Sequence, residues 1–277
     1  MKGTFRFIWL VLALTLAIGW SVGTHRALAA GELAKIKAAD HIRIAVFSDK
    51  PPFGYVDENG VNKGYDVYLA HRLAEDLLGD PNKVKFVLVE AASRISTLEA
   101  DKADIVLANF TYTTERAQQV DFAKPYMKVA LGVASPQSAP ITDVAQLAGK
   151  KLIVNKGTTA DSYFTKNHPE IELIKYDQNT EAFNALRDGR GVALAHDNTL
   201  LFAWVRENTG FVTGIDFLGD QDTINPAVKK GNTELLEWLN QEVDKLTAEK
   251  FFYSNYEETL RPIYGEAVDE NSVLITE

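Results

Sequence analysis

The chain has 277 residues, of which 46% are hydrophobic and 24% are charged, as in an ordinary globular protein. Its net charge of -9 at pH 7 argues against a general nucleic-acid-binding protein. It contains no cysteine, which excludes both disulfides and a cysteine that could carry a lipid, so we do not expect a lipoprotein.

The first thirty residues have the order of a secretory signal peptide. Lys2 and Arg6 precede the apolar run FIWLVLALTLAIGW, and the small residues ALAA follow it. The alternative, a membrane anchor, would need about 20 apolar residues. We therefore predict a signal peptide over residues 1–29, cleaved after Ala29 or Ala30, and a mature protein in an extracytoplasmic space, most simply a periplasm.

Strand-like and helix-like patterns alternate from residue 41 onward. Apolar residues recur at helical spacing over 65–79, and Gly79 is a typical helix end. The expected strands are 41–47, 83–91 and 104–110, and the expected helices are 65–79, 94–103 and one that begins at 113. This alternation is the pattern of a parallel sheet covered by helices.

A second series follows an extended apolar run at 128–135. Its expected strands are 150–157, 171–176 and 192–197, and its expected helices are 158–167, 179–191 and 198–208. The chain returns through an extended segment at 223–231. The last helices, over 232–255 and 256–265, are expected to pack back on the first series, and the acidic tail that follows them is expected to be frayed.

We interpret this order as an α/β protein of two lobes. Lobe 1 comprises residues 30–127 plus 226–277, and lobe 2 comprises residues 128–225. Two extended crossings, near 127–130 and near 224–227, join the lobes and are predicted to act as hinges beside a cleft.

Signals for enzymatic chemistry are weak. The sequence has no G-x-S-x-G, no Walker-type loop and no H-E-x-x-H, and its five histidines are scattered. We therefore predict no catalytic residue, no metal site and no cofactor.

Donor side chains gather after the strand at 104–110, in the stretch ANFTYTTER. Thr111 supplies a hydroxyl, and five residues later Arg116 supplies a guanidinium fork suited to a carboxylate. The alternative for Arg116 is a surface ion pair with Glu115 or Asp121.

Two strand ends in the second series carry further candidates. Gly157, Thr158 and Thr159 lie between a strand and a helix, where backbone N–H groups favour an anion. The threonines are alternatively plain N-caps. His196 and Asp197 end the strand at 192–197, where Asp197 either pairs with an ammonium group or caps the next helix.

Together these groups meet the needs of a zwitterionic α-amino acid. Arg116, Thr111 and Thr159 would hold its carboxylate, and Asp197 would balance its ammonium group. Open α/β sheets bind ligands at such strand ends.

Four segments carry a resemblance to a known family. PPFGYVDENGVNKGYDVYLAHRLAEDL, ADIVLANFTYTTERAQQVDFAKPY, NKGTTADSYF and VALAHDNTLLFAWV resemble the bacterial periplasmic polar amino-acid-binding proteins, the family 3 solute-binding proteins, over about 35–265. The resemblance implies a two-lobed type II periplasmic-binding-protein fold that closes on its ligand. It also implies delivery of a free amino acid to an inner-membrane ABC permease. We expect a monomer that binds no nucleic acid.

The resemblance implies a role for each residue at a matching position. Arg116 holds the ligand carboxylate together with Thr159, Asp197 receives the ammonium group, and Arg94 resembles an arginine that selects the side chain. Asn109 faces the ligand with its backbone. The full predicted ligand site is Lys50, Phe53, Arg94, Asn109, Thr111, Arg116, Lys156, Gly157, Thr158, Thr159, His196 and Asp197.

The chain departs from the family at one position. Where many members carry an aromatic ring that stacks on the ligand, this sequence has Lys50, flanked by Phe47 and Phe53. The departure changes the side chain that the pocket prefers.

The combination of these motifs is most similar to that of the cysteine-binding branch of the family, so the predicted ligand is L-cysteine. Glutamine-binding and glutamate-binding proteins share the His-Asp pair or the basic lining and remain alternatives. A second alternative is an enzyme that resembles cyclohexadienyl dehydratases, with Glu90 or His196 as general acid. The retained Arg116 and Asp197 favour binding without catalysis.

Overall fold

The computed structural model describes residues 31–275. The predicted signal peptide at 1–29 and its cleavage site therefore lie outside the described residues. Between residues 31 and 275, no helix combines the length and the apolar character needed to cross a membrane.

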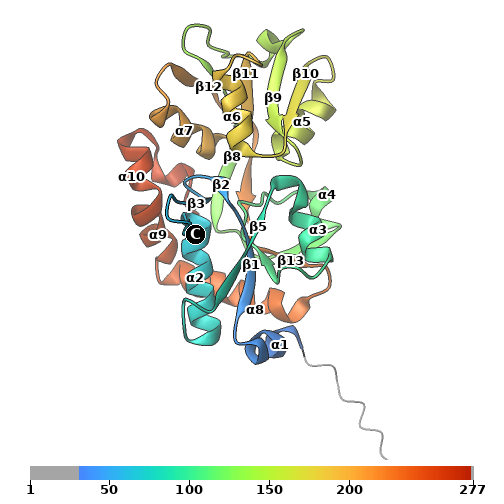
Figure 1. The fold of residues 1–277 in the computed structure, drawn as a ribbon, viewed down its shortest axis with the longest axis vertical. Helices are drawn as coiled ribbons and strands as arrows, with labels where there is room; N and C mark the ends of the chain where they lie inside the picture. Colours follow the sequence, from blue (N-terminus) through green and yellow to red (C-terminus); the bar gives the residue numbers. More distant parts are fainter. Residues whose placement is uncertain (1–30, 276–277) are drawn as a thin grey trace, which may run out of the picture. The chain divides into compact units, whose positions relative to one another are not determined.

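The first sheet has five strands in the order β5-β1-β6-β13-β7 (Figure 1). β1 pairs in parallel with β5 and β6, and β13 runs antiparallel to β6 and β7. The strands are β1 (Ile42–Phe47), β5 (Val84–Val89), β6 (Ile105–Val106), β7 (Val120–Phe122) and β13 (Ala227–Lys229). The helices in this part of the chain are α1 (Glu32–Ala39), α2 (Tyr65–Leu78), α3 (Arg94–Glu99) and α4 (Thr114–Ala117). We call this sheet and its helices lobe 1.

The second sheet has the order β10-β9-β11-β8-β12. β9 pairs in parallel with β10 and β11, whereas β8 runs antiparallel to β11 and β12. Its strands are β8 (Met127–Pro136), β9 (Lys151–Asn155), β10 (Glu172–Tyr176), β11 (Ala193–Asp197) and β12 (Phe211–Ile224), and its helices are α5 (Thr159–Asn167), α6 (Asn179–Arg187) and α7 (Asn198–Glu207). We call this part lobe 2. The α/β alternation predicted from the sequence is confirmed.

A small third sheet lies between β1 and α2. Its strands are β2 (Asp49–Lys50), β3 (Gly54–Val56) and β4 (Asn62–Lys63). Short 3-10 turns occur at Ala91–Ser93, Val144–Leu147, Gly265–Ala267 and Glu270–Ser272.

The helix expected over 65–79 is confirmed as α2. Its buried face includes Val67, Leu69 and Leu73, and Gly79 ends it in the left-handed region at φ 75°. The helix expected to begin at 113 is much shorter. α4 has four residues, because the chain turns at once into β7, whose Val120 is fully buried.

The chain passes between the two sheets twice. It leaves lobe 1 after β7 and enters β8 at Met127, and it returns between the end of β12 at Ile224 and the start of β13 at Ala227. Met127 and Ile224 are paired across the two crossing strands. That these crossings act as hinges stays a prediction.

The C-terminal helices depart from the expectation that all of them pack on lobe 1. α8 (Thr233–Ala248) and α9 (Phe251–Thr259) contact lobe 1 elements, but α10 (Arg261–Tyr264) lies beside α7 of lobe 2 (Figure 1). Tyr264 Oη donates to the Thr199 carbonyl at 2.9 Å. The tail was also expected to be frayed, but Val273 is fully buried and its carbonyl accepts from Lys128 N at 2.7 Å.

Candidate functional site

The predicted site residues lie where strands of both sheets end. Lys50 follows β1, Asn109 follows β6, Gly157 follows β9, and Asp197 ends β11. Contacts between these residues cross from lobe 1 to lobe 2. The carboxyl ends of the parallel strands in the two sheets therefore face one shared site, as expected for open α/β sheets.

A buried ion pair joins the lobes at this site. Lys50 Nζ of lobe 1 lies 2.6 Å from Asp197 Oδ2 of lobe 2, and their side chains are 2% and 5% exposed. Burial alone would raise the pKa of Asp197, but the adjacent Lys50 charge holds it well below its ordinary value. Lys50 thus occupies one oxygen of the carboxylate that was predicted to receive a ligand ammonium group. Asp197 lies at the N-cap of α7 but its side chain does not cap that helix.

His196 is a buried, neutral neighbour of this pair. The Asp197 backbone N–H donates to His196 Nδ1 at 2.7 Å, so the proton lies on Nε2, which contacts Asn179 Oδ1 at 3.1 Å. Burial, together with the Lys50 charge, lowers the pKa of His196. Both ring nitrogens are engaged, which disfavours a general acid at this position.

Two buried arginines of lobe 1 reach a single carbonyl of lobe 2. Arg94 Nη2 donates to the Gly157 carbonyl at 3.2 Å, and Arg116 Nη2 donates to the same oxygen at 2.8 Å. Burial lowers the pKa of Arg116 to about 10, and burial together with the Arg116 charge lowers the pKa of Arg94 well below its ordinary value. Within residues 31–275 neither guanidinium forms a salt bridge, so the alternative for Arg116, an ion pair with Glu115 or Asp121, is not formed.

Each of the three cations contacts aromatic rings. Lys50 Nζ lies 5.2 Å from the centroid of the Phe47 ring and 5.8 Å from that of Phe53. Arg94 Cζ lies 5.6 Å from the Phe47 centroid. Both arginines also contact the Phe110 ring, whose centroid lies 4.3 Å from Arg94 Cζ and 4.8 Å from Arg116 Cζ. Each contact is in the range of cation–π attraction, which partly offsets the burial of three like charges.

Sequence reasoning missed the carboxylate that positions Asn109. Asp66 is fully buried at the start of α2, and its oxygens accept from Asn109 N at 2.8 Å and from Tyr126 Oη at 2.7 Å. Asn109 has φ 42°, and its Oδ1 accepts from Lys50 Nζ at 2.6 Å. Burial raises the pKa of Asp66 to about 7. The signal that the sequence offered was an acidic residue at the start of an apolar helix face.

The predicted loop at the start of α5 divides into two groups. Thr158 caps the helix by accepting from Asp161 N at 3.2 Å, which is the alternative role expected for the threonines of this loop. Thr159 is half-buried at the first helical position, whereas Lys156 is exposed and pairs with Asp177 at 2.9 Å. The structure therefore places Lys156 outside the contact network that holds the other charged residues.

Two further groups lie close to the network. Thr111 is buried, and its carbonyl accepts from Arg116 Nη1 at 2.7 Å. Asn155, at the end of β9, is 1% exposed, and neither polar atom of its side chain has a partner in the described part of the chain. A buried amide without partners is costly, so Asn155 is a candidate ligand contact that the sequence reading missed.

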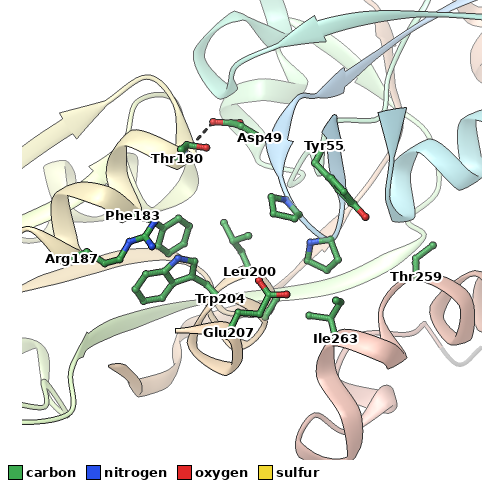
Figure 2. Close-up of a pocket in the computed structure, with 13 residues that line it drawn as sticks. Asp49, Tyr55, Thr180, Phe183, Arg187, Leu200, Trp204, Glu207, Thr259 and Ile263 are labelled. Carbon is green, nitrogen blue, oxygen red and sulfur yellow. Dashed lines mark hydrogen bonds between the residues drawn. The ribbon is translucent and has the colours of Figure 1, made fainter. Parts of the chain in front are cut away.

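A separate cavity of about 280 Å³ lies between the lobes and contains none of the predicted site residues. Figure 2 shows Phe183 stacked on Trp204 along one wall, with Tyr55 and two prolines across from them. Beside it, Asp49 of lobe 1 accepts from Thr180 N at 3.2 Å and from Asn179 Nδ2 at 3.0 Å, both at the start of α6 (Figure 2). This carboxylate therefore links lobe 1 to a helix N-terminus of lobe 2.

No group of three or more acidic or histidine side chains in residues 31–275 could hold a metal ion. A small zwitterion carries the charges that would complement those of Arg116 and Asp197. Donors for a carboxylate come from Arg116, and an acceptor for an ammonium group comes from Asp197 Oδ1, which accepts no hydrogen bond from the described residues.

Comparisons with known proteins point to a family of solute-binding proteins. A model of the bacterial extracellular solute-binding proteins, family 3, matches residues 42–258. A solved solute receptor for L-cysteine of Neisseria gonorrhoeae is 58% identical, with a TM-score of 0.87, covering 88% of this chain and 99% of that one. A cysteine-binding protein of Campylobacter jejuni is 57% identical, with a TM-score of 0.88, covering 90% and 100%. The ABC transporter glutamine-binding protein of Bacillus subtilis is 31% identical over 232 residues, 83% of this chain and 84% of that protein.

Proposed function

The chain belongs to the bacterial extracellular solute-binding proteins, family 3, as a solute-binding protein of amino-acid ABC transport, and we propose that its ligand is L-cysteine. It binds the free amino acid between its lobes, without catalysis, and passes it to an inner-membrane permease. We further propose that it acts as a monomer in the periplasm, after removal of residues 1–29.

The observation that carries this proposal is the placement of Arg116 and Asp197. Arg116 is 8% exposed and Asp197 is 4% exposed, and they face one site from opposite lobes. An α-carboxylate bound by Arg116 and an α-ammonium group bound by Asp197 Oδ1 would complete the contacts of both. The identity of 57–58% to two cysteine-binding proteins supports cysteine as the side chain.

The predicted site is retained in this proposal with adjusted roles. Asn109 accepts a hydrogen bond from Lys50, and the Thr111 carbonyl accepts one from Arg116. Phe53 contacts Lys50 through its ring. On lobe 2 the site is lined by Gly157, Thr158 and Thr159. His196 orients Asp197 through its backbone. Lys156 is the one predicted member with no role, because its side chain pairs with Asp177.

A thermal-shift screen on protein that has been unfolded, freed of ligand and refolded tests the ligand. We expect L-cysteine to give the largest shift among the twenty amino acids and cystine, ahead of glutamine and glutamate. A ligand at 100 times its Kd stabilises the folded state by about 2.7 kcal/mol. A screen led by arginine or histidine would refute the side-chain assignment.

The Asp49 contact with α6 tests whether ligand binding closes the lobes. Asp49→Ala removes a contact that exists only when the lobes meet, and it leaves the proposed ligand contacts intact. Hydrogen bonds of this kind contribute about 1 kcal/mol, so we expect cysteine affinity to fall about 5-fold. Calorimetric titration measures the change, with Glu99→Ala as an exposed lobe 1 control. Equal affinities in the two variants would count against closure at α6.

A further inference from the structure

The hydrogen-bond donors of the site outnumber the acceptors that a zwitterionic backbone brings. An ammonium group has three donors, and Lys50 uses two of them, on Asn109 Oδ1 and Asp197 Oδ2. A guanidinium has five, and Arg94 uses four of them, on the carbonyls of Ala91, Ala108, Asn109 and Gly157. Within the described residues, each of these two cations therefore keeps one unused N–H.

Arg116 has more donors to spare. Only two of its five N–H groups are used, on the carbonyls of Thr111 and Gly157. The remaining three suffice for a bidentate contact with the α-carboxylate. The unused donors of Lys50 and Arg94 are thus left for the ligand side chain, and the two cations lie on the same aromatic ring, that of Phe47.

The other ionisable groups around the site do not supply the missing acceptor. They are Asp66, Glu115, Tyr126, His196, Asp197 and Asp222, of which Glu115 is exposed on α4. Asp66 is committed to Asn109 and Tyr126, and Asp197 Oδ1 is reserved for the ammonium group. Asp222 is half-buried on β12 and forms no salt bridge among the described residues, although its charge acts on Arg116.

From this arrangement, and resting on the proposed function, we infer that the protein binds L-cysteine as its thiolate. The sulfur accepts from Lys50 and Arg94, and the thiol proton is released to solvent. A thiol is a weak acceptor, whereas a thiolate beside Lys or Arg is stabilised strongly enough to lower its pKa from about 8.5 into the range of about 3.5 to 7.5. The preference for cysteine over serine follows, because a serine hydroxyl does not ionise in this range.

The absence of cysteine from the chain makes the inference directly measurable. Any thiolate absorbance in the ultraviolet, and any signal from L-cysteine labelled with ¹³C at Cβ, belongs to the ligand. In anaerobic solution at pH 6.5 we expect the bound ligand to show the thiolate absorbance and thiolate Cβ shift, while free cysteine shows the thiol.

The affinity for L-cysteine should depend on pH through the ionisation of the ligand thiol. Between the bound pKa and about 8.5, cysteine affinity should rise close to tenfold per pH unit, because the free ligand must lose a proton to bind. Binding near pH 7 should release close to one proton. S-methyl-L-cysteine and L-serine keep the amino-acid backbone but carry no ionising sulfur, so they should show neither effect. Any proton uptake by Asp66 would appear equally with all three ligands.

The variants Lys50→Met and Arg94→Met should each raise the pKa of the bound thiol, and the exposed control Lys124→Met should not. Cysteine bound as a thiol from pH 6 to 8, with S-methyl-L-cysteine bound equally well, would overturn the thiolate inference and leave the proposed function standing. A failure of cysteine to bind, or tighter binding of glutamate, would overturn both.

Discussion

Asp197→Ala should weaken L-cysteine binding by at least about 30-fold. Two effects act in the same direction. The ligand ammonium group loses its carboxylate, and closing the lobes then buries Lys50, which is 1% exposed, with Asn109 as its remaining side-chain partner. Truncating one member of a buried charge pair costs about 2 to 5 kcal/mol in comparable interfaces.

The stability of the ligand-free variant distinguishes this role from helix capping. Because the Asp197 side chain does not cap α7, its loss should leave the unfolding free energy nearly unchanged when the lobes are apart and Lys50 is in water. At an L-cysteine concentration that saturates the parent, solution scattering should show a larger radius of gyration for Asp197→Ala than for the parent, since the variant binds less ligand and lacks the Lys50 contact between the closed lobes. Near-normal cysteine affinity in the folded variant would show that the ammonium group is held elsewhere.

The parts of the fold that the sequence predicts are those that local patterns determine. α2 follows from apolar spacing and Gly79, and β9 and β11 follow from short apolar runs. The break between α8 and α9 has no such signal. Lys250 adopts φ 58° there. A glycine at this position would have predicted such a left-handed conformation, but a lysine does not. The contact of α10 with α7 joins Tyr264 to Thr199 over 65 positions, beyond any local pattern.

The same division applies to the candidate site. Arg116 and Asp197 are recognisable because each follows a strand, and the carboxyl ends of strands are where such sheets bind ligands. The partners of these residues are set by tertiary contacts. Lys50 meets Asp197 across 147 positions, and Asp66 meets Asn109 across 43. Only the folded chain shows that the lysine in place of a family aromatic ring reaches the carboxylate expected to bind the ligand.

The ammonium group of Lys50 competes with a ligand cation for one carboxylate oxygen of Asp197. A ligand with a cationic side chain would therefore meet both Lys50 and Arg94 as like charges. Such juxtaposed charges discriminate against a wrong partner. We therefore expect the site to select against arginine and lysine through repulsion, independently of how well it holds cysteine.

Arg116→Met should weaken the binding of every α-amino acid that the protein accepts by a similar factor, at least about 30-fold. The reason is that Arg116 is proposed to contact the α-carboxylate, which cysteine, S-methyl-L-cysteine and serine share. Arg116→Lys should recover only part of the loss, because an ammonium group cannot form the bidentate contact. Arg94→Met is the matched comparison, since it removes a neighbouring guanidinium on the same Phe110 ring and should affect cysteine more than S-methyl-L-cysteine.

Ligand-free stability gives the second half of this test. Arg116 is buried beside another guanidinium and forms no salt bridge within residues 31–275, so replacing it removes a desolvated charge and leaves no carboxylate unpaired. The replacement also removes the hydrogen bond to the Thr111 carbonyl, whereas the Gly157 carbonyl still accepts from Arg94. We therefore expect the unfolding free energy of ligand-free Arg116→Met to fall by no more than about 1 kcal/mol. Thermal unfolding and calorimetric titration of the same preparations measure both quantities. A marked loss of stability together with unchanged affinity would assign Arg116 to the fold of lobe 1 and remove it from the ligand site.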